Sequence, residues 1–134
     1  MTPEYQRILL VDDDDVTNFL SREIFRHYHP DVCIDIAQNG KEAIELLLRA
    51  SEEGEASLPQ IILLDINMPV MDGWDFLDHF KAMAESRPNL GEIRVFILTS
   101  SVYPEDIKRA MTYPLVQKAY SKPLNDRQIE EMMG

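Results

Sequence analysis

Short apolar runs alternate with longer amphipathic segments along the whole sequence. The runs are rich in β-branched and aliphatic residues, which is typical of buried strands. They predict strands over residues 7–11, 32–37, 61–64, 93–98 and 116–121. The segments between the runs repeat apolar residues at helical spacing, and they predict helices over 14–29, 41–50, 74–85, 104–111 and from after Pro123 to the end of the chain.

This alternation predicts the fold class. Strands separated by helices need crossover connections, which are nearly always right-handed and produce a parallel sheet covered on both faces. We therefore expect an α/β fold, with a doubly wound, five-stranded parallel sheet and helices on both faces. Ligands of such folds bind beyond the carboxyl ends of the strands, so the residues that follow each strand are the candidates for chemistry.

The first predicted helix has a pronounced apolar pattern. Val16, Phe19, Leu20, Ile24 and Tyr28 recur at helical spacing, which is typical of an amphipathic helix.

The composition limits the classes of function. The 134 residues predict one domain, 1–134, large enough to bury a core. The net charge of -11 argues against binding of nucleic acid and against docking to anionic membranes. The N-terminus shows no signal pattern, and no apolar stretch approaches the roughly 20 residues needed to span a bilayer, so we expect a cytoplasmic protein. The single cysteine, Cys33, cannot form an internal disulfide and is expected to be a small buried hydrophobe.

Carboxylates gather at the ends of two predicted strands. Asp12 and Asp13 follow the first strand and Asp65 follows the third. Crowded carboxylates repel each other, and a bound divalent cation is the usual means of offsetting that repulsion. We expect Asp13 and Asp65 to bind Mg²⁺ directly together with the backbone carbonyl of Asn67, while Asp12 acts from the second shell through a water molecule.

The next two aspartates have a different expected role. Asp14 and Asp15 stand at the start of the first helix, where carboxylates accept hydrogen bonds from free amides and oppose the positive end of the helix dipole. We expect these two side chains to cap the helix. In the same way, Asp72 and Gly73 are interpreted as a turn and helix start rather than as metal ligands.

The last two strands add groups that suit a phosphate. Thr99 follows the fourth strand with a hydroxyl donor, and Lys122 follows the fifth with a positive charge. Ser100 is a weaker candidate for the same role. A metal site, a hydroxyl and a lysine provide the positioning and charge neutralisation that phosphoryl transfer needs, and an aspartate beside the metal can itself be the nucleophile.

With these residues in place, the sequence resembles the receiver domains of two-component response regulators, and the stand-alone single-domain type in particular. The resemblance covers essentially the whole chain and rests on five motifs in the expected order: ILLVDDD at 8–14, NGKEA at 39–43, LDINMPVMDG at 64–73, ILTS at 97–100 and SKPL at 121–124. It implies a flavodoxin-like sheet with strand order 2-1-3-4-5.

The resemblance also implies how the site works. Asp65 would accept a phosphoryl group, in the presence of Mg²⁺, from a phosphohistidine of a sensor histidine kinase or a histidine phosphotransfer protein. Thr99 and Lys122 would then contact the phosphoryl group and rearrange the loops after the fourth and fifth strands. The altered surface of the fourth helix, fifth strand and fifth helix would signal to a downstream protein partner.

One position departs from the family pattern. Receiver domains usually carry a switch aromatic three residues before the lysine of the fifth strand, and this position holds Ala119. The aromatic residue, Tyr120, stands one position later and would point to the opposite face of a regular strand. Either the strand carries a bulge, or Thr99 is not coupled to an aromatic side chain in the usual way.

Two other classes of function compete with a phosphoryl-switched signalling protein, which would not be an enzyme. One is a Mg²⁺-dependent phosphohydrolase working through an aspartyl phosphate. Such enzymes commonly carry a general acid two residues after the nucleophile, and Asn67 at that position cannot transfer a proton in this way. The other is an interaction scaffold that is never phosphorylated, which the complete set of site residues disfavours.

Overall fold

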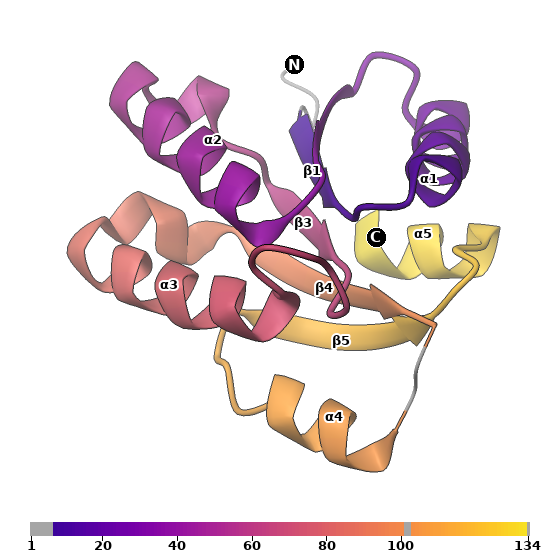
Figure 1. The fold of residues 1–134 in the computed structure, drawn as a ribbon. Coiled ribbons are helices and arrows are strands. Elements are labelled where there is room, and N and C mark those ends of the chain that lie inside the picture. Colours follow the sequence, from indigo (N-terminus) through magenta and orange to yellow (C-terminus); the bar gives the residue numbers. More distant parts are fainter. Residues whose placement is uncertain (1–6, 101–102, 134) are drawn as a thin grey trace.

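The computed structural model, shown in Figure 1, describes residues 7–100 and 103–133. Its described residues form a parallel five-stranded sheet of order β2-β1-β3-β4-β5, which confirms the predicted fold class and strand order. The strands are β1 (Arg7–Val11), β2 (Cys33–Ala37), β3 (Ile61–Leu64), β4 (Arg94–Thr99) and β5 (Val116–Ser121). The helices are α1 (Asp15–Tyr28), α2 (Gly40–Glu53), α3 (Gly73–Ser86), α4 (Pro104–Ala110) and α5 (Asp126–Met133).

Helices cover both faces of the sheet, α2, α3 and α4 on one face and α1 and α5 on the other (Figure 1). Successive residues of a strand point to opposite faces, so each central strand supplies both layers of the core. In β1, Leu9 and Val11 pack in the cluster under α2 and α3, while Ile8 and Leu10 pack in the cluster under α1 and α5. None of the helices in the described part of the chain is long and apolar enough to cross a membrane.

Several boundaries differ from the predicted ones. The helix predicted over 41–50 is longer at both ends, because α2 runs from Gly40 to Glu53, and a 3₁₀ turn follows at Glu55–Ser57. A second 3₁₀ turn, Pro88–Glu92, leads into β4, which begins and ends one residue later than predicted. Glu52 and Glu53 are exposed and are good helix formers, and the helix ends only at Gly54, which is its C-cap.

The buried face of α1 is not the one that the apolar pattern indicated. Val16, Phe19 and Leu20 are 65%, 51% and 49% exposed, whereas Asn18 and Ser21 are buried. Asn18 faces inward because its side-chain amide donates a 2.9 Å hydrogen bond to the backbone carbonyl of Asp12. A polar contact near the strand end therefore sets the rotation of the helix and leaves apolar side chains in solvent.

The expectation for Cys33 was also wrong, because its thiol is exposed. Cys33 lies on β2, which is an edge strand of the sheet and is covered less than β1 and β3. An apolar residue type on an edge strand is a weaker sign of burial than on a central one.

Two glycines bring the loops of the sheet's carboxyl edge together. The amide of Gly73 donates a 2.8 Å hydrogen bond to the carbonyl of Ile66, and a Cβ atom at Gly73 would lie 2.7 Å from the carbonyl oxygen of Asp65. The amide of Gly40 donates a 2.9 Å hydrogen bond to the carbonyl of Met71. The start of α3 is thus packed directly on the backbone that carries Asp65.

Candidate functional site

The candidate site lies at the carboxyl ends of neighbouring strands. Val11 of β1 is in register with Leu64 of β3, so the next residues, Asp12 and Asp65, emerge side by side. The amide of Asp65 donates a 2.9 Å hydrogen bond to the carbonyl of Val11, which extends the pairing of the two strands by one more contact. The sheet register therefore holds the two carboxylates at the same edge.

Three carboxylates meet there. Ligand oxygens of Asp12, Asp13 and Asp65 all lie within 4.8 Å of one another. Asp12 and Asp65 are buried and Asp13 is exposed, so the cluster has a closed side and a side open to solvent. Hard carboxylate oxygens with one open side fit a divalent cation such as Mg²⁺, which keeps several waters when it binds to proteins.

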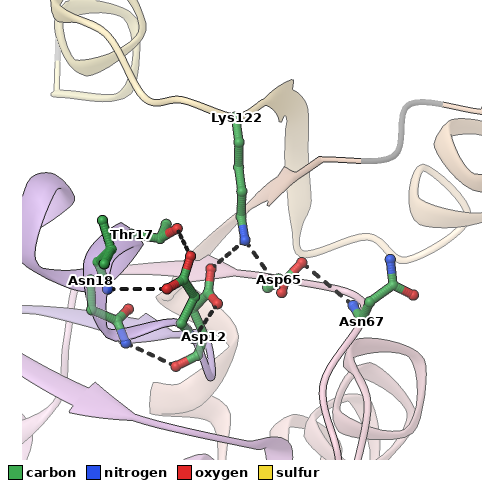
Figure 2. Close-up of polar contacts among 8 residues, drawn as sticks. Asp12, Thr17, Asn18, Asp65, Asn67 and Lys122 are labelled. Atoms are coloured by element: carbon green, nitrogen blue, oxygen red, sulfur yellow. Dashed lines mark hydrogen bonds and ion pairs between the residues drawn. The ribbon is translucent and has the colours of Figure 1, made fainter.

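Lys122 provides the positive charge of the site. Its ammonium nitrogen lies 2.7 Å from Oδ2 of Asp12 and 3.5 Å from Oδ2 of Asp65, as Figure 2 shows. The amide of Lys122 donates a 2.9 Å hydrogen bond to the carbonyl of Thr99, so the ends of β4 and β5 hold the lysine in place. The carboxylate that pairs most closely with Lys122 is thus Asp12.

Burial and charge shift the proton affinity of Asp65. Desolvation by burial, reinforced by the nearby charge of Asp12, raises the pKa of Asp65 to about 6, against the opposing effect of Lys122. Burial alone would lower the pKa of Lys122, but its contacts with Asp12 and Asp65 outweigh it and the net shift is upward. The site therefore combines a carboxyl group that is harder to ionise than usual with a lysine that is harder to deprotonate than usual.

Of the two aspartates expected to cap α1, Asp14 does so and Asp15 does not. Asp14 is the N-cap of α1, where its carboxylate accepts hydrogen bonds from the amide of Val16 at 3.1 Å and the hydroxyl of Thr17 at 2.7 Å. Asp15 lies in the first turn and accepts a hydrogen bond from the side-chain amide of Gln38 at 2.9 Å. Asp72 likewise caps α3 by accepting a hydrogen bond from the amide of Asp75, so the helix-start interpretation is confirmed for it.

The remaining candidates surround this centre at different depths. Thr99 is buried at the end of β4, while Ser100 next to it is exposed. The amide of Asn67 approaches Oδ1 of Asp65 at a long 3.4 Å, also drawn in Figure 2. A metal-ligating role for the Asn67 carbonyl and a phosphate contact by Thr99 or Ser100 stay predictions.

The structure explains the departure at Ala119 and Tyr120. The pairing of β4 with β5 shifts by one residue between Val95 and Phe96, so β5 does carry a bulge, at its beginning. Beyond the bulge Ala119 pairs with Ile97, and Tyr120 belongs to the core cluster under α1 and α5. The bulge thus does not turn Tyr120 toward α4. Its ring stacks on Phe96, and its hydroxyl donates a 3.0 Å hydrogen bond to Glu131.

Two residues near the site were not predicted. Thr17 and Asn18 line a small cavity together with Asp12 and Asp65, and Asn18 holds the backbone of Asp12. A sequence signal for Asn18 does exist, because 18, 21 and 25 follow one another at helical spacing and are the buried positions of α1. Two of the three are polar, which hid the pattern from a search for apolar residues.

Comparison with known proteins gives a consistent result. The family model described as response regulator receiver domain matches residues 8–133. The probable methanogenesis regulatory protein FilR2 of Methanothrix harundinacea is 33% identical over 129 residues, which cover 93% of this chain and 79% of that protein.

Solved structures agree with the sequence relatives. A two-component response regulator from Cytophaga hutchinsonii is 34% identical, with a TM-score of 0.86 over 97% of this chain and 95% of that one. The phosphorylated cyanobacterial phytochrome response regulator RcpA is 29% identical, with a TM-score of 0.76 over 96% of this chain and 89% of that one.

Proposed function

The chain belongs to the response regulator receiver family of two-component signalling, and we propose that it accepts a phosphoryl group on Asp65 in a Mg²⁺-dependent reaction. One observation carries the proposal. The buried carboxylate of Asp65 lies against Asp12, Asp13 and Lys122 at the carboxyl edge of the sheet, where ligands of this fold bind. Receiver domains are signalling modules, and we propose no enzymatic turnover for this one beyond slow loss of its own phosphoryl group.

The chemistry follows from the charges. An oxygen of Asp65 bonds to the phosphorus of a phosphohistidine as the phosphorus–nitrogen bond breaks, and the departing histidine nitrogen keeps the electron pair and takes up a proton. Asp13, Asp65 and the Asn67 carbonyl would hold Mg²⁺, with Asp12 acting through a water molecule. When bound, Mg²⁺ neutralises charge on the phosphoryl oxygens.

Lys122 and Thr99 are proposed to hold the product. Lys122 lies 3.5 Å from Asp65 already and is 18% exposed, so a phosphoryl oxygen on Asp65 can compete with Asp12 for its ammonium group. Thr99 ends the strand next to β3 and would donate its hydroxyl to another phosphoryl oxygen. Phosphorylation would therefore draw the ends of β4 and β5 toward Asp65.

The exposed apolar residues of α1 support a protein as the phosphoryl donor. Phe19 and Leu20 follow Val16 by three and four residues, a spacing that places the three side chains on one side of the helix. The N-cap of this helix, Asp14, adjoins the acidic cluster. Adjoining apolar side chains in solvent mark protein interaction sites. We propose that a sensor histidine kinase or a histidine phosphotransfer protein docks here.

On the output side, we propose that a downstream protein partner recognises α4, β5 and α5. We propose that residues 1–134 work as one receiver domain. The cytoplasmic location of the protein stays a prediction. Nucleic acid and membranes are not proposed as partners, because 24 acidic side chains face 13 basic ones.

The test uses acetyl phosphate as a small phosphodonor. With Mg²⁺, intact-mass measurement should show a transient gain of one phosphoryl group, and chelation of Mg²⁺ should abolish it. The variant Asp65→Ala should show no gain, while Asp75→Ala, which removes an exposed carboxylate of α3, should behave like the wild type. No adduct on the wild type would refute the proposal, and rapid steady release of phosphate would favour a phosphohydrolase.

A further inference from the structure

A small cavity separates α4 from the sheet. It has a volume of about 10 Å³, about the room of one water molecule. Thr99 forms its wall toward the candidate site, Ala119 lines it from β5, and Ile107 and Ala110 line it from α4. Trp74, near the start of α3, also lines it, as do Ile66, Ile97, Asp106 and Tyr120, and we call this space the α4 cavity.

Trp74 is also the centre of an aromatic cluster that ties α4 to α3. The guanidinium carbon of Arg109 on α4 lies 4.3 Å from the centroid of the Trp74 ring. The ring of Tyr113, just beyond α4, stacks on Trp74 with centroids 6.5 Å apart and planes inclined by 22°. The Tyr113 hydroxyl donates a 2.6 Å hydrogen bond to Asp78, one turn further along α3.

The backbone of Trp74 is held close to the candidate site. Gly73 packs against the backbone of Asp65 and Ile66, which anchors the start of α3 beside the candidate site. The indole of Trp74 is only partly buried. On α4 itself, Ala110 is the buried residue, so this short helix has a small buried face of its own. The contact between Arg109 and Trp74 is consequently a substantial part of what positions α4.

Tyr120 is the other aromatic residue that lines the α4 cavity, but its ring stacks on Phe96 in the cluster on the opposite face of the sheet. Ala119 presents only a methyl group to the α4 cavity, and Tyr120 lies in the cluster on the other face, bonded to Glu131. Trp74 is the only tryptophan of the sequence.

We propose that Trp74 relays the state of Asp65 to α4. When Thr99 moves to contact a phosphoryl group on Asp65, the α4 cavity grows by the space that Thr99 leaves. Protein interiors do not keep such voids, because the lining atoms lose their contacts. The indole of Trp74 moves into the space over Ala119, and Arg109 follows the ring and carries α4 with it. This inference rests on the proposed function of Asp65.

The first test reads Trp74 by its own fluorescence. The protein is treated with acetyl phosphate and Mg²⁺, and emission spectrum, acrylamide quenching and intact mass are measured on the same sample. On formation of the adduct, emission should shift to shorter wavelength and quenching should fall, because the indole becomes more buried. The variant Ala119→Leu fills the α4 cavity and should form the adduct but lose the spectral shift. The control Ala84→Leu changes a residue of α3, the helix that carries Trp74, away from the α4 cavity, and this variant should keep the spectral shift.

The second test follows α4 by hydrogen exchange of the peptide that contains residues 104–110. Phosphorylation should change its exchange in the wild type. Arg109→Ala should lose this change, and Lys108→Ala, which removes the neighbouring exposed charge of α4, should retain it. Both are surface substitutions, so folding of the variants is not in question.

The outcomes separate the relay from the proposed function. An adduct without a change in Trp74 emission would overturn the relay and leave phosphorylation of Asp65 intact. A full spectral shift in Ala119→Leu would also overturn it, because the shift would then report the phosphoryl charge directly. Equal exchange changes in Arg109→Ala and the wild type would refute the link to α4. Absence of any adduct would overturn both proposals.

Discussion

Replacing Asp65 by asparagine should stabilise the protein in the absence of metal, although it removes a side chain that contacts Lys122. The reason is the raised pKa of about 6, which burial and the charge of Asp12 impose on this carboxyl. A carboxylate whose pKa is higher in the folded than in the unfolded protein destabilises the fold wherever it is ionised.

The magnitude follows from the shift. Because the pKa of an ordinary aspartate carboxyl is 3.8 and that of Asp65 is about 6, ionised Asp65 destabilises the folded state by about 3 kcal/mol at pH 7.5. This destabilisation is fully present well above pH 6, shrinks as the pH falls from 6 toward 4, and disappears only below the unfolded pKa of 3.8, where the carboxyl is protonated in both states. At pH 5 it amounts to about half of its full value. The gain from Asp65→Asn should follow the same course.

The assay is urea unfolding followed by circular dichroism, in chelator, at pH 7.5 and pH 5. The control Asp31→Asn removes one exposed carboxylate and should leave the free energy of unfolding within about 0.5 kcal/mol. Added Mg²⁺ should stabilise the wild type, because it binds only the folded site, and should narrow the gap to the variant. If Asp65→Asn is no more stable than the wild type at pH 7.5 in chelator, the account of repulsion and burial in this site is wrong.

Other substitutions test neighbouring parts of the account by the same unfolding measurement. Gly73→Ala places a Cβ atom 2.7 Å from the backbone that follows β3 and should destabilise by about 1–3 kcal/mol, whereas Gly91→Ala, with nothing within 4 Å, should not; equal effects would refute the close approach. Lys122→Met leaves buried carboxylates uncompensated and should cost about 3 kcal/mol at pH 7.5 but less at pH 5; a loss independent of pH would contradict the electrostatic reason. Asp14→Ala should lower the free energy of unfolding by removing the cap of α1 and should retain the response to Mg²⁺, whereas Asp13→Ala should lose that response; the reverse result would show that the aspartate run is divided wrongly.

The bounds of a strand could be predicted from the sequence where a short apolar run coincides with the buried part of the strand. The bounds of β1, β3 and β5 agree with the predicted 7–11, 61–64 and 116–121, and the first two lie between helices on both faces. The polar strand ends then located the candidate site, since parallel strands bring their carboxyl ends to one edge. Asp12, Asp13 and Asp65 meet there as expected.

Features that depend on long-range contacts were not predictable in this way. The rotation of α1 is set by Asn18 and its bond to the Asp12 carbonyl, and no helical pattern of apolar residues contains that information. The preference of Lys122 for Asp12 depends on the positions of three strand ends, which place its ammonium nitrogen 2.7 Å from Asp12 and 3.5 Å from Asp65. The proposed role of Trp74 depends on its contact with Arg109, 35 residues later in the chain, and the apolar character of a tryptophan does not indicate such a contact.

The central claim is that a phosphoryl group is transferred to one particular carboxylate. Borohydride reduction tests it most directly, because it converts an aspartyl phosphate into homoserine that survives digestion and sequencing by tandem mass spectrometry. After treatment with acetyl phosphate and Mg²⁺, homoserine should be found at the position of Asp65, with unmodified aspartate at Asp12 and Asp13. Homoserine at Asp12 or Asp13, or at none of the three despite a gain in intact mass, would contradict the account.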